Sequence, residues 1–495
     1  MSTNPSEILS FEVTRGEKSG DLLSNRRGDK KLKVGLLACA YFEYWRMYPG
    51  LQDQVRGDMQ TVADRICQRF DVVYPGMVDT LDLADQAGRR FKQEAIDVLI
   101  ITEGTYCTDY IVHQCLLHLP PSLPVCLFAS QVHTRLNFSA TYDQSLRNSG
   151  PMGIVQLAAG FRKMGAYPRF TTVVGGNDEP AAYEEIFRFI DVWTTILNLK
   201  HWNVALIGHV FRGMYDFQFD KTAVTGKLGP HIIDLDIKHL VGLLNEIPRD
   251  DRRVAELAKK VRDLYTVVGL EDSDIVSSAR LAIAFQDLVR RYKLDGLVLL
   301  GQHFIEQQAN STCYLGLSEL LSSDQALAVT EGDVLGLIMS KVLKDFSGKT
   351  PFFGEWEEID LSLNAVMLLG HGFIDPRLAR KDRPIQVQPA CENWGFEGNS
   401  LGFEATYAPG PVTLTHCIQD QKGWRILVGE GEILDTPPLR ISECSLVVRV
   451  EQDVRRSFRQ IIELGFPHHV IATPGRFSGH LEYFARQLDL EVCRV

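Results

Sequence analysis

The chain has 495 residues, a formal net charge of -11 and a pI near 5.7, with 45% hydrophobic and 23% charged residues. At roughly 150 residues per domain this length predicts three domains, and the composition is that of a soluble globular protein. The acidic balance argues against nucleic acid or an anionic membrane as a partner, because those surfaces bind basic patches. Small uncharged or metal-bound substrates remain open.

The cysteines and the N-terminus predict a cytoplasmic protein. The ten cysteines are irregularly spaced and form no CxxC pair, a pattern typical of reduced thiols inside the cell. The first 31 residues are a polar leader without the apolar segment of a signal peptide or membrane anchor. The longest apolar runs, such as residues 98–101, have the length of strands and are far too short to span a membrane.

Residues 32–200 alternate between strand and helix patterns. Strands are predicted at 32–39, 72–74, 96–101 and 125–128, and helices over 51–70, 80–94, 153–164 and 179–197, the last two flanking residues 173–176. This alternation predicts a Rossmann-like α/β domain whose parallel sheet is covered on both faces. Ligands of such domains bind in the loops that follow the strands.

Residues 201–350 repeat this alternation, and residues 351–495 do not. The second region predicts strands at 203–209, 232–234 and 296–300 and helices over 249–265, 275–291 and 331–343, and therefore a second Rossmann-like domain. The third predicts strands at 365–369, 411–415, 424–428 and 445–450, separated by turn residues, and a terminal helix over 479–488. This pattern is typical of an antiparallel, barrel-like domain.

Two acids and an imidazole recur within about forty residues, each beside a glycine or at the end of an apolar run. They are Glu331 in Glu-Gly-Asp, Glu355 in Gly-Glu-Trp and His371 in Gly-His-Gly, and the pair His468 and His469 follows near the C-terminus. Such an oxygen and nitrogen set suits Mn²⁺, Co²⁺ or Mg²⁺ better than a sulfur-rich zinc site. If these side chains meet, they hold a divalent metal.

Simpler interpretations exist for each of these residues. Glu331 starts a predicted helix, where an acid in the first turn is favourable, and Asp333 can serve as its N-cap. Glu355 lies with Glu357 and Glu358 in what reads as a solvated acidic turn. A histidine taken singly is more often structural than a ligand.

Loops after the predicted strands, and the turn before the strand at 470–472, supply candidate substrate-binding residues. They are Tyr41, Phe42, Glu103, Gln131, Arg212 and His468. The aromatic loop that contains Tyr41 and Phe42 is equally compatible with core packing and with stacking on a sugar. The chain has no GxGxxG, GxxxxGK or GxSxG motif, so nucleotide-phosphate binding and a hydrolase nucleophile lose support.

The ordered set Glu331-Gly332-Asp333, Glu355, His371 and His468-His469 resembles the L-arabinose isomerase and L-fucose isomerase family of ketol isomerases. The steps from 331 to 355, 355 to 371 and 371 to 469 are 24, 16 and 98 residues. The resemblance extends loosely from residue 33 to 495. It implies a metal, Mn²⁺ first, with Co²⁺ or Mg²⁺ as alternatives, bound by Glu331, Glu355, His371 and His469.

The resemblance also implies the chemistry. Glu331 and Glu355 would move the substrate proton in an enediol mechanism, and a raised pKa on one of them would help to divide the acid and base roles. Loops at 41–46 and 131–148 differ from the family pattern and suggest a different substrate. The predicted protein is a cytoplasmic, metal-dependent aldose-ketose isomerase of a small unphosphorylated sugar, assembled as a homotrimer or homohexamer. The alternatives are an epimerase or lyase acting on a modified sugar, and a non-catalytic sugar-binding protein.

Overall fold

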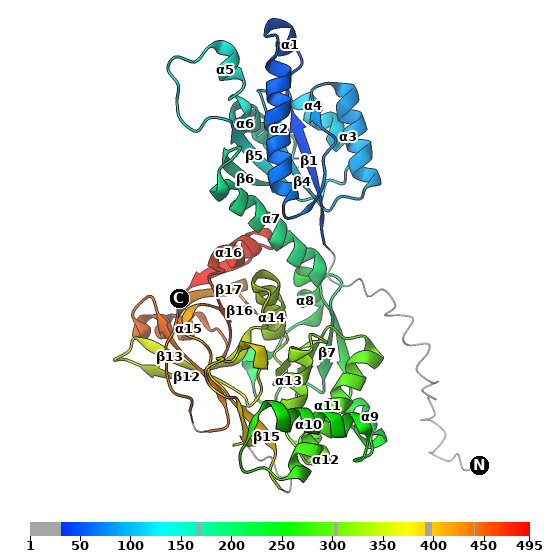
Figure 1. Ribbon diagram of the computed structural model, residues 1–495, viewed down its shortest axis with the longest axis vertical. Coiled ribbons are helices and arrows are strands. Elements are labelled where there is room, and N and C mark those ends of the chain that lie inside the picture. Colours follow the sequence, from blue (N-terminus) through cyan, green and yellow to red (C-terminus); the bar gives the residue numbers. More distant parts are fainter. Residues whose placement is uncertain (1–30, 166–169, 301–303, 392–397, 440) are drawn as a thin grey trace, which may run out of the picture. The chain divides into compact units, whose positions relative to one another are not determined.

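The computed structural model describes residues 31–165, 170–300, 304–391, 398–439 and 441–495, so the predicted leader at 1–31 lies almost wholly outside the described residues. The described chain forms two compact units, one ending at Ile196 and one running from Leu197 to Val495. Both units mix helices with parallel sheets, and the second also carries a separate antiparallel sheet (Figure 1). Within the described residues, every helix is too short or too polar to span a lipid bilayer.

The first unit is built on a parallel sheet, as predicted. Its strand order is β2 (Asp71–Val73), β1 (Lys33–Cys39), β4 (Val98–Glu103), β5 (Val125–Gln131) and β6 (Phe170–Gly176), and β3 (Met77–Val78) pairs with the end of β1. The helices are α1 (Tyr44–Met47), α2 (Leu51–Cys67), α3 (Leu81–Gln93), α4 (Asp109–Leu116), α5 (Tyr142–Leu146), α6 (Gly150–Met164) and α7 (Pro180–Leu199).

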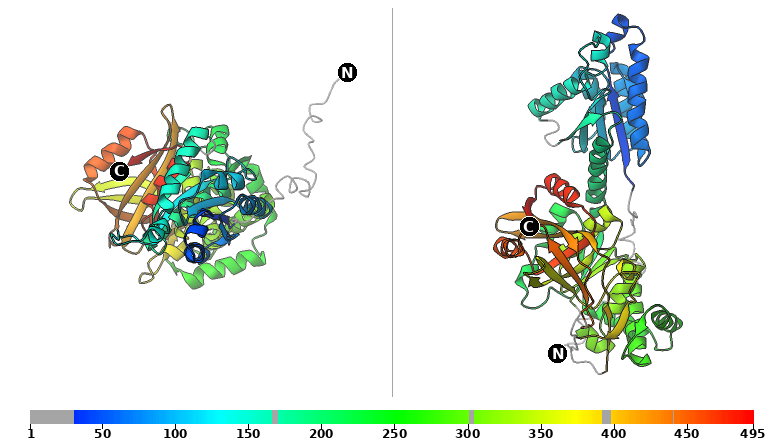
Figure 2. Two further views of the ribbon diagram at one scale, coloured as in Figure 1. Left: turned by 90° about the horizontal axis from the view of Figure 1, so that it is seen from above. Right: turned by 60° about the vertical axis from the view of Figure 1, so that its left-hand side comes forward.

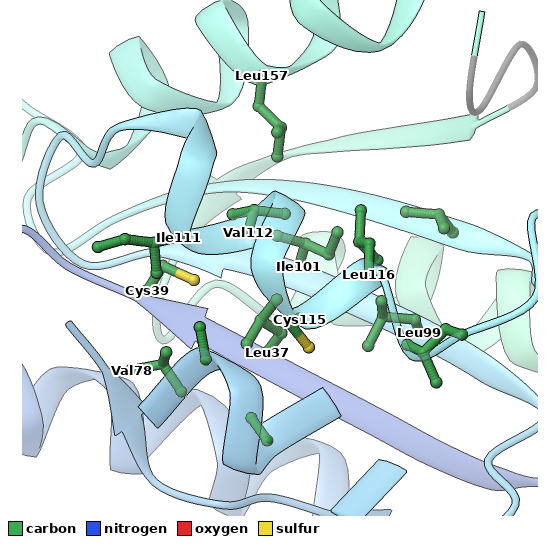
Figure 3. Packing of buried hydrophobic residues seen from close by; sticks show 14 of the residues in the cluster. Leu37, Cys39, Val78, Leu99, Ile101, Ile111, Val112, Cys115, Leu116 and Leu157 are labelled. Carbon is green, nitrogen blue, oxygen red and sulfur yellow. The ribbon is translucent and has the colours of Figure 1, made fainter. Parts of the chain in front are cut away.

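The core of this unit lies on both faces of the sheet. Leu37, Leu99 and Ile101 project from one face and pack against Ile111 and Cys115 of α4 in one buried cluster (Figure 3). The alternate strand residues, such as Leu36 and Ile100, point to the opposite face and are also fully buried. Burial on both faces explains why these strands are continuous apolar runs.

The second unit begins with a four-stranded parallel sheet, again as predicted. Its order is β11 (Leu327–Thr330), β10 (Gly296–Leu299), β7 (Asn203–Ile207) and β8 (His231–Leu235). The helices of this part are α8 (Lys221–Leu228), α9 (Ile237–Glu246), α10 (Arg252–Leu264), α11 (Asp272–Tyr292), α12 (Phe304–Ala309), α13 (Tyr314–Ser322) and α14 (Val334–Ser347), and the short 3-10 helix η3 spans Tyr215–Phe217.

An antiparallel sheet follows, drawn in yellow, orange and red in Figure 2. Its order is β16 (Gly410–Asp420), β19 (His469–Pro474), β12 (Phe352–Asp360), β13 (Ala365–Gly370), β18 (Cys444–Val450), β17 (Gly423–Ile433) and β20 (Glu491–Arg494), of which only β20 pairs in parallel. β17 also pairs with β16. A small sheet joins β15 (Leu401–Glu404), β14 (Gln386–Pro389) and β9 (Thr266–Val267). The barrel and the boundary between domains at 350/351 stay predictions.

Two local differences from the sequence analysis concern this region. Glu355 lies inside β12 and not in a turn, because the strand starts at the buried Phe352 and continues through the acidic residues. The helix α15 (Val454–Leu464) was not predicted, since its buried face consists of only Val454, Ser457 and Ile461. The terminal helix α16 (Ser478–Gln487) is confirmed.

Helix α14 joins the two large sheets of the second unit. It contacts β10 and β11 on one side and β16 and β19 on the other. Every residue from Val334 to Leu343 is buried as a result, including Lys341, whose ammonium pairs with Asp345 at 2.6 Å. A helix that is apolar all round is typical of such a sandwiched position.

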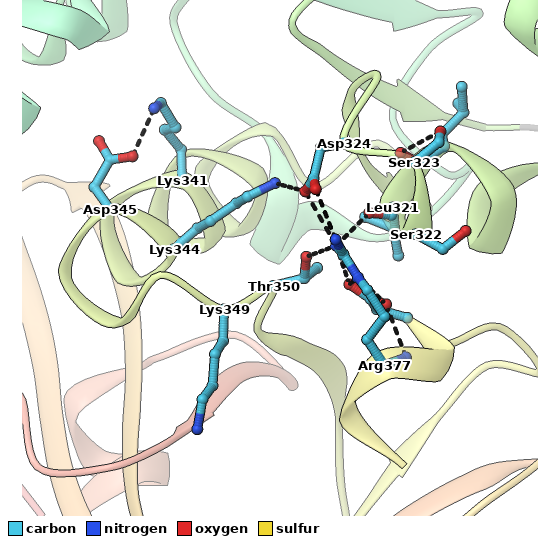
Figure 4. Close-up of polar contacts among 12 residues, drawn as sticks. Leu321, Ser322, Ser323, Asp324, Lys341, Lys344, Asp345, Lys349, Thr350 and Arg377 are labelled. Atoms are coloured by element: carbon cyan, nitrogen blue, oxygen red, sulfur yellow. Dashed lines mark hydrogen bonds and ion pairs between the residues drawn. The ribbon is translucent and has the colours of Figure 1, made fainter.

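An ion-pair network holds the segment that follows β13 (Figure 4). Arg377, in the 3-10 helix η4 (Pro376–Leu378), donates to Asp324 at 2.6 Å, to Asp375 at 2.7 Å and to the carbonyl of Leu321 at 2.9 Å. The Asp375 side chain is only 1% exposed, whereas that of Asp324 is half exposed. Arg377 therefore neutralises one buried and one exposed carboxylate.

We expect Arg377→Gln to lower the free energy of unfolding by about 3 kcal/mol, because it leaves the buried carboxylate of Asp375 without its cation. The control Asp324→Asn removes only a half-exposed charge and should cost less than about 1 kcal/mol. Urea unfolding of the full chain measures both. Equal losses in the two variants would contradict the importance of Asp375.

Candidate metal centre

Four of the predicted site residues come together in the second unit. Glu331, Glu355, His371 and His469 each offer one donor atom, and these atoms all lie within 4.8 Å of one another. Glu331 follows β11, Glu355 lies in β12, His371 follows β13 and His469 begins β19. The parallel and antiparallel sheets thus both contribute to one cluster.

The register of the antiparallel sheet places three of the four. In the central strand β12, Glu355 lies opposite His469 of β19 on one side and Leu369 of β13 on the other. His371 comes two residues after Leu369, on the same face by strand alternation. Pairing across three neighbouring strands therefore brings one acid and two imidazoles together, although 98 residues separate the imidazoles in sequence.

The fourth residue, Glu331, lies in a strained turn between β11 and α14. Its φ is +63°, a left-handed conformation that is uncommon outside glycine, and Gly332 follows with φ +84°. A Cβ on Gly332 would lie 2.4 Å from the Cα of Val210. The amide of Phe211 donates to the Glu331 carbonyl at 3.0 Å. The segment after β7 thus packs tightly on this turn and fixes it.

The polar atoms of the cluster converge on one point. Nε2 of His371 lies 3.1 Å from Oε1 of Glu355, and Nε2 of His469 lies 3.2 Å from Oε2 of Glu331. Both Nε2 atoms are buried, and neither makes a hydrogen bond to any part of the chain that the structure describes. Two buried imidazole nitrogens facing two carboxylates fit a divalent cation that accepts oxygen and nitrogen ligands.

Asp333 orients one of these imidazoles from behind. Its Oδ2 accepts from Nδ1 of His469 at 3.0 Å and from Nε2 of His416 at 2.9 Å, while Oδ1 accepts from the amide of Gly336 at 2.7 Å. The predicted N-cap role of Asp333 is therefore confirmed. A carboxylate behind a ligating histidine fixes the ring and its tautomer.

Sequence analysis missed His416. Its side chain is 2% exposed in β16, inside a run of buried residues from Val412 to Ile418. A polar ring within such a run needs a buried partner. The position of His416 in this run could have marked it as a residue with a buried polar partner. The partner, Asp333, is 83 residues away in sequence and could not be identified from it.

The electrostatics of the cluster differ from one expectation. Burial alone would raise the pKa of Glu331, but His468, His469 and His371 outweigh it and lower that pKa to about 2. Burial alone would also raise the pKa of Glu355, but the imidazoles of His371 and His469 outweigh burial and lower that pKa. Neither acid has the raised pKa that was expected of one of them. The physical reason is that each carboxylate faces more than one imidazole.

Two substrate candidates belong to the second unit, His468 beside the cluster and Arg212 next to Phe211, whose amide contacts Glu331. Nε2 of His468 is 3.6 Å from Oε2 of Glu331, but His468 is not among the four grouped donors. Arg212 is exposed in the segment between β7 and η3, one residue after Phe211. Their roles toward a substrate stay predictions.

Four candidates lie in the first unit, at the carboxyl edge of its sheet. Tyr41 packs edge-on against Phe42 and Tyr44, with ring centroids 5.5 and 5.3 Å apart. Gln131 ends β5. Glu103 is buried at 1% exposure and accepts from the amide of Cys107 at 2.9 Å. The substrate roles of Tyr41, Phe42, Glu103 and Gln131 stay predictions.

A cavity of about 830 Å³ lies elsewhere in the second unit. Pro474, the last residue of β19, lines it together with Lys349 and Arg377, whereas the cluster contains His469, the first residue of that strand. None of its lining residues belongs to the metal cluster. This cavity is therefore separate from the candidate metal centre.

The fold and the cluster define a mixed α/β protein with a candidate divalent-metal centre of two carboxylates and two imidazoles. No family model matches the chain. The chain is similar to a sulfoquinovose isomerase from Alkalicoccus urumqiensis, with 22% identity over 330 residues, covering 66% of this chain and 72% of that protein. That relative is, by its name, an isomerase of a sugar, which supports a sugar isomerase family more than arabinose or fucose isomerase in particular.

Comparison with solved structures adds little. A galactofuranose binding protein matches with 10% identity and a TM-score of 0.15, covering 65% of this chain and 90% of that one. A fructose binding periplasmic domain of a hybrid two-component system matches with 12% identity and a TM-score of 0.15, covering 64% and 86%. Likenesses at this level carry no argument about this chain.

The buried Glu103 makes a pH-dependent prediction. Desolvation raises the pKa of Glu103 well above its ordinary value of 4.5. Below pH 4.5 the Glu103 carboxyl is protonated in both the folded and the unfolded state. At higher pH it ionises first in the unfolded state, which stabilises the unfolded state relative to the folded one. The free energy of unfolding therefore contains a Glu103 penalty that grows as pH rises from 4.5 toward the folded pKa.

We expect Glu103→Gln to remove this penalty, so that its stability relative to the wild type increases between pH 5 and pH 8. Urea unfolding at both pH values measures the difference. Glu184→Gln, an exposed exchange on α7, is the matched control and should show no such trend. A stability difference for Glu103→Gln that does not change with pH would contradict the buried, protonated carboxyl.

Proposed function

We propose that the chain is a divalent-metal-dependent aldose-ketose isomerase that acts on an unphosphorylated sugar. The observation that carries this proposal is the convergence of Glu331, Glu355, His371 and His469 within 4.8 Å. The similarity to a sulfoquinovose isomerase supports the reaction class independently of that geometry. Mn²⁺ is the first candidate metal and Co²⁺ and Mg²⁺ are alternatives, because the donors are oxygen and nitrogen atoms.

The four side chains would hold the ion, and Asp333 would keep the ring of His469 turned toward it. A divalent cation bound there polarises a sugar carbonyl and lowers the cost of the negative charge that develops on its oxygen. The remaining chemistry belongs to the side chains. The two carboxylates are both held ionised by their imidazole neighbours, and the ionised carboxylate is the form that a general base requires.

The two acids differ in the exposed fraction of their side chains, and this difference suggests a separate role for each. The Glu355 side chain is 27% exposed and that of Glu331 is 6% exposed. Glu355 is thus the carboxylate that an entering sugar meets, and we assign to it the transfer of the proton between C2 and C1. Glu331, surrounded by imidazoles, would exchange the proton between the two sugar oxygens.

Substrate choice is open within this class. The name of the relative makes sulfoquinovose, a sulfonated aldose, the first sugar to test, followed by unmodified pentoses, hexoses and deoxysugars. An epimerase or lyase would use the same carboxylates on a different bond of the sugar. A non-catalytic sugar-binding protein would bind the sugar without using the carboxylates to move a proton. We also propose, from the resemblance to arabinose and fucose isomerases, a homotrimer or homohexamer.

We expect the chain supplied with Mn²⁺ to convert an aldose of this panel to its ketose and to lose the activity in EDTA. In heavy water an enediol mechanism should leave deuterium at C1 or C2 of the product, which NMR detects. Replacing Glu331 with Gln should lower kcat at least 100-fold, because a neutral amide cannot accept the proton.

The matched control is Glu357→Gln, which changes an exposed acid of the same strand and should leave kcat within twofold. Absence of ketol interconversion across the whole panel would refute the isomerase. Elimination or epimer products would favour the alternative enzymes. Sugar affinity that survives Glu331→Gln in a chain without turnover would favour the binding protein.

His416 provides a test of the metal itself. Because His416 and His469 share one oxygen of Asp333, His416→Gln should loosen the carboxylate and weaken Mn²⁺ binding about 10- to 100-fold. Electron paramagnetic resonance titration of free Mn²⁺ measures this without any substrate. The exposed His231→Gln is the control, and an unchanged affinity in His416→Gln would contradict the supporting role.

A further inference from the structure

The 3-10 helix η3 packs directly on the histidine pair beside the candidate metal centre. Phe217, 5% exposed, stacks on His469 with ring centroids 4.3 Å apart and planes at 25°. The same ring lies 4.7 Å from the ring of His468. A short segment that follows the parallel strand β7 thus reaches the first residue of β19.

Asp216, the residue before Phe217, contacts both the backbone amide and the imidazole ring of His468. Oδ2 of Asp216 lies 2.6 Å from Nδ1 of the ring and accepts from the His468 backbone amide at 3.4 Å. One carboxylate oxygen therefore fixes both the backbone and the ring orientation. Sequence analysis did not single out Asp216, which is 252 residues from its partner.

The other ring nitrogen of His468 faces the cluster. Nε2 lies 3.6 Å from Oε2 of Glu331, too far for a hydrogen bond. The His468 side chain is 38% exposed, whereas those of His371 and His469 are 10% and 0% exposed. Of these three imidazoles, that of His468 is therefore the most open to an entering molecule.

We propose that Asp216 is the positioning residue that aims the ring of the candidate substrate-binding residue His468, so that Nε2 of this ring meets the sugar. This inference rests on the proposed function and adds Asp216 to it. Because Asp216 pairs with Nδ1, it fixes the ring with Nε2 on the side of Glu331, where this nitrogen can form a hydrogen bond to a sugar hydroxyl. The hydroxyl would then lie next to Glu331, on the exposed side of the cluster.

A purely structural role for Asp216 makes different predictions. If the contact served only to attach η3 to β19, its loss would lower stability or metal binding and would not single out the substrate. If it positions His468, its loss should weaken sugar binding and turnover while Mn²⁺ still binds. Asp216 is not among the four grouped donors, so the two outcomes can be separated.

The test uses the Mn²⁺-loaded full chain with the sugar that gives the highest turnover or, without turnover, the tightest binding. We expect Asp216→Ala and His468→Ala each to lower kcat/KM about 10- to 100-fold, the range for groups that support site residues. The double variant should lose little more than either single variant, because both act through one contact. Asp216→Asn, which keeps an acceptor oxygen, should lose less than Asp216→Ala.

Three further measurements make the result decisive. Mn²⁺ affinity and the thermal midpoint of Asp216→Ala should stay close to wild type, and Tyr215→Ala, an 86% exposed neighbour on η3, should leave all properties unchanged. Calorimetry of sugar binding gives a readout that does not need turnover.

The outcomes separate the two proposals. If the wild type binds sugar without converting it, the isomerase proposal is refuted. In that case, weaker sugar binding by Asp216→Ala and His468→Ala would still support the positioning role of Asp216. An active wild type with unaffected variants overturns the inference alone. Losses in Asp216→Ala that follow metal binding or unfolding also overturn it, and a wild type that neither binds nor converts any sugar overturns both.

Discussion

The carboxylate of Asp333 makes three hydrogen bonds that the second unit and its candidate site both depend on. Oδ1 caps the first turn of α14 at Gly336, and Oδ2 accepts from His416 in β16 and His469 in β19. Because α14 is packed between the parallel and antiparallel sheets, this single group connects both. Burial opposes its charge, but the two imidazoles outweigh burial and keep the pKa of Asp333 below its ordinary value. A buried carboxylate with three donors is stable as an anion.

This arrangement explains how a site with several buried charges can exist. Each acid of the cluster faces more than one imidazole, so burial does not neutralise the two carboxylates. The left-handed φ of Glu331 is tolerated because Gly332 and the segment at Val210 and Phe211 hold the turn from outside. Strain of this kind is concentrated at functional sites in proteins, which agrees with the proposed role.

The segment after β7 connects the parallel sheet to the chemistry. Its start fixes Glu331 through the Phe211 amide, and its end places Asp216 and Phe217 on the histidine pair. In parallel sheets ligands bind at the carboxyl ends of the strands. Here the segments that follow β7 and β11 lie at the cluster, whose other donors come from the antiparallel sheet. In the candidate metal centre the donors come from two sheets, so loops around it can vary and change the substrate while the donors stay fixed.

The sequence by itself determined the parallel sheets, the antiparallel character of the third region, the cap at Asp333 and the four grouped donors. Hydrophobic periodicity reports burial along one element, and an N-cap is a local interaction, so both can be read from neighbouring residues. The four donors were found through their order and spacing, although Glu331 and Glu355 had simpler interpretations when taken singly. Only the tertiary structure decided that Glu355 lies in a strand opposite His469, that His416 supports Asp333, and that Asp216 holds His468. These contacts join residues 83 to 252 positions apart, and strand register and helix packing, which a single sequence does not display, bring them together.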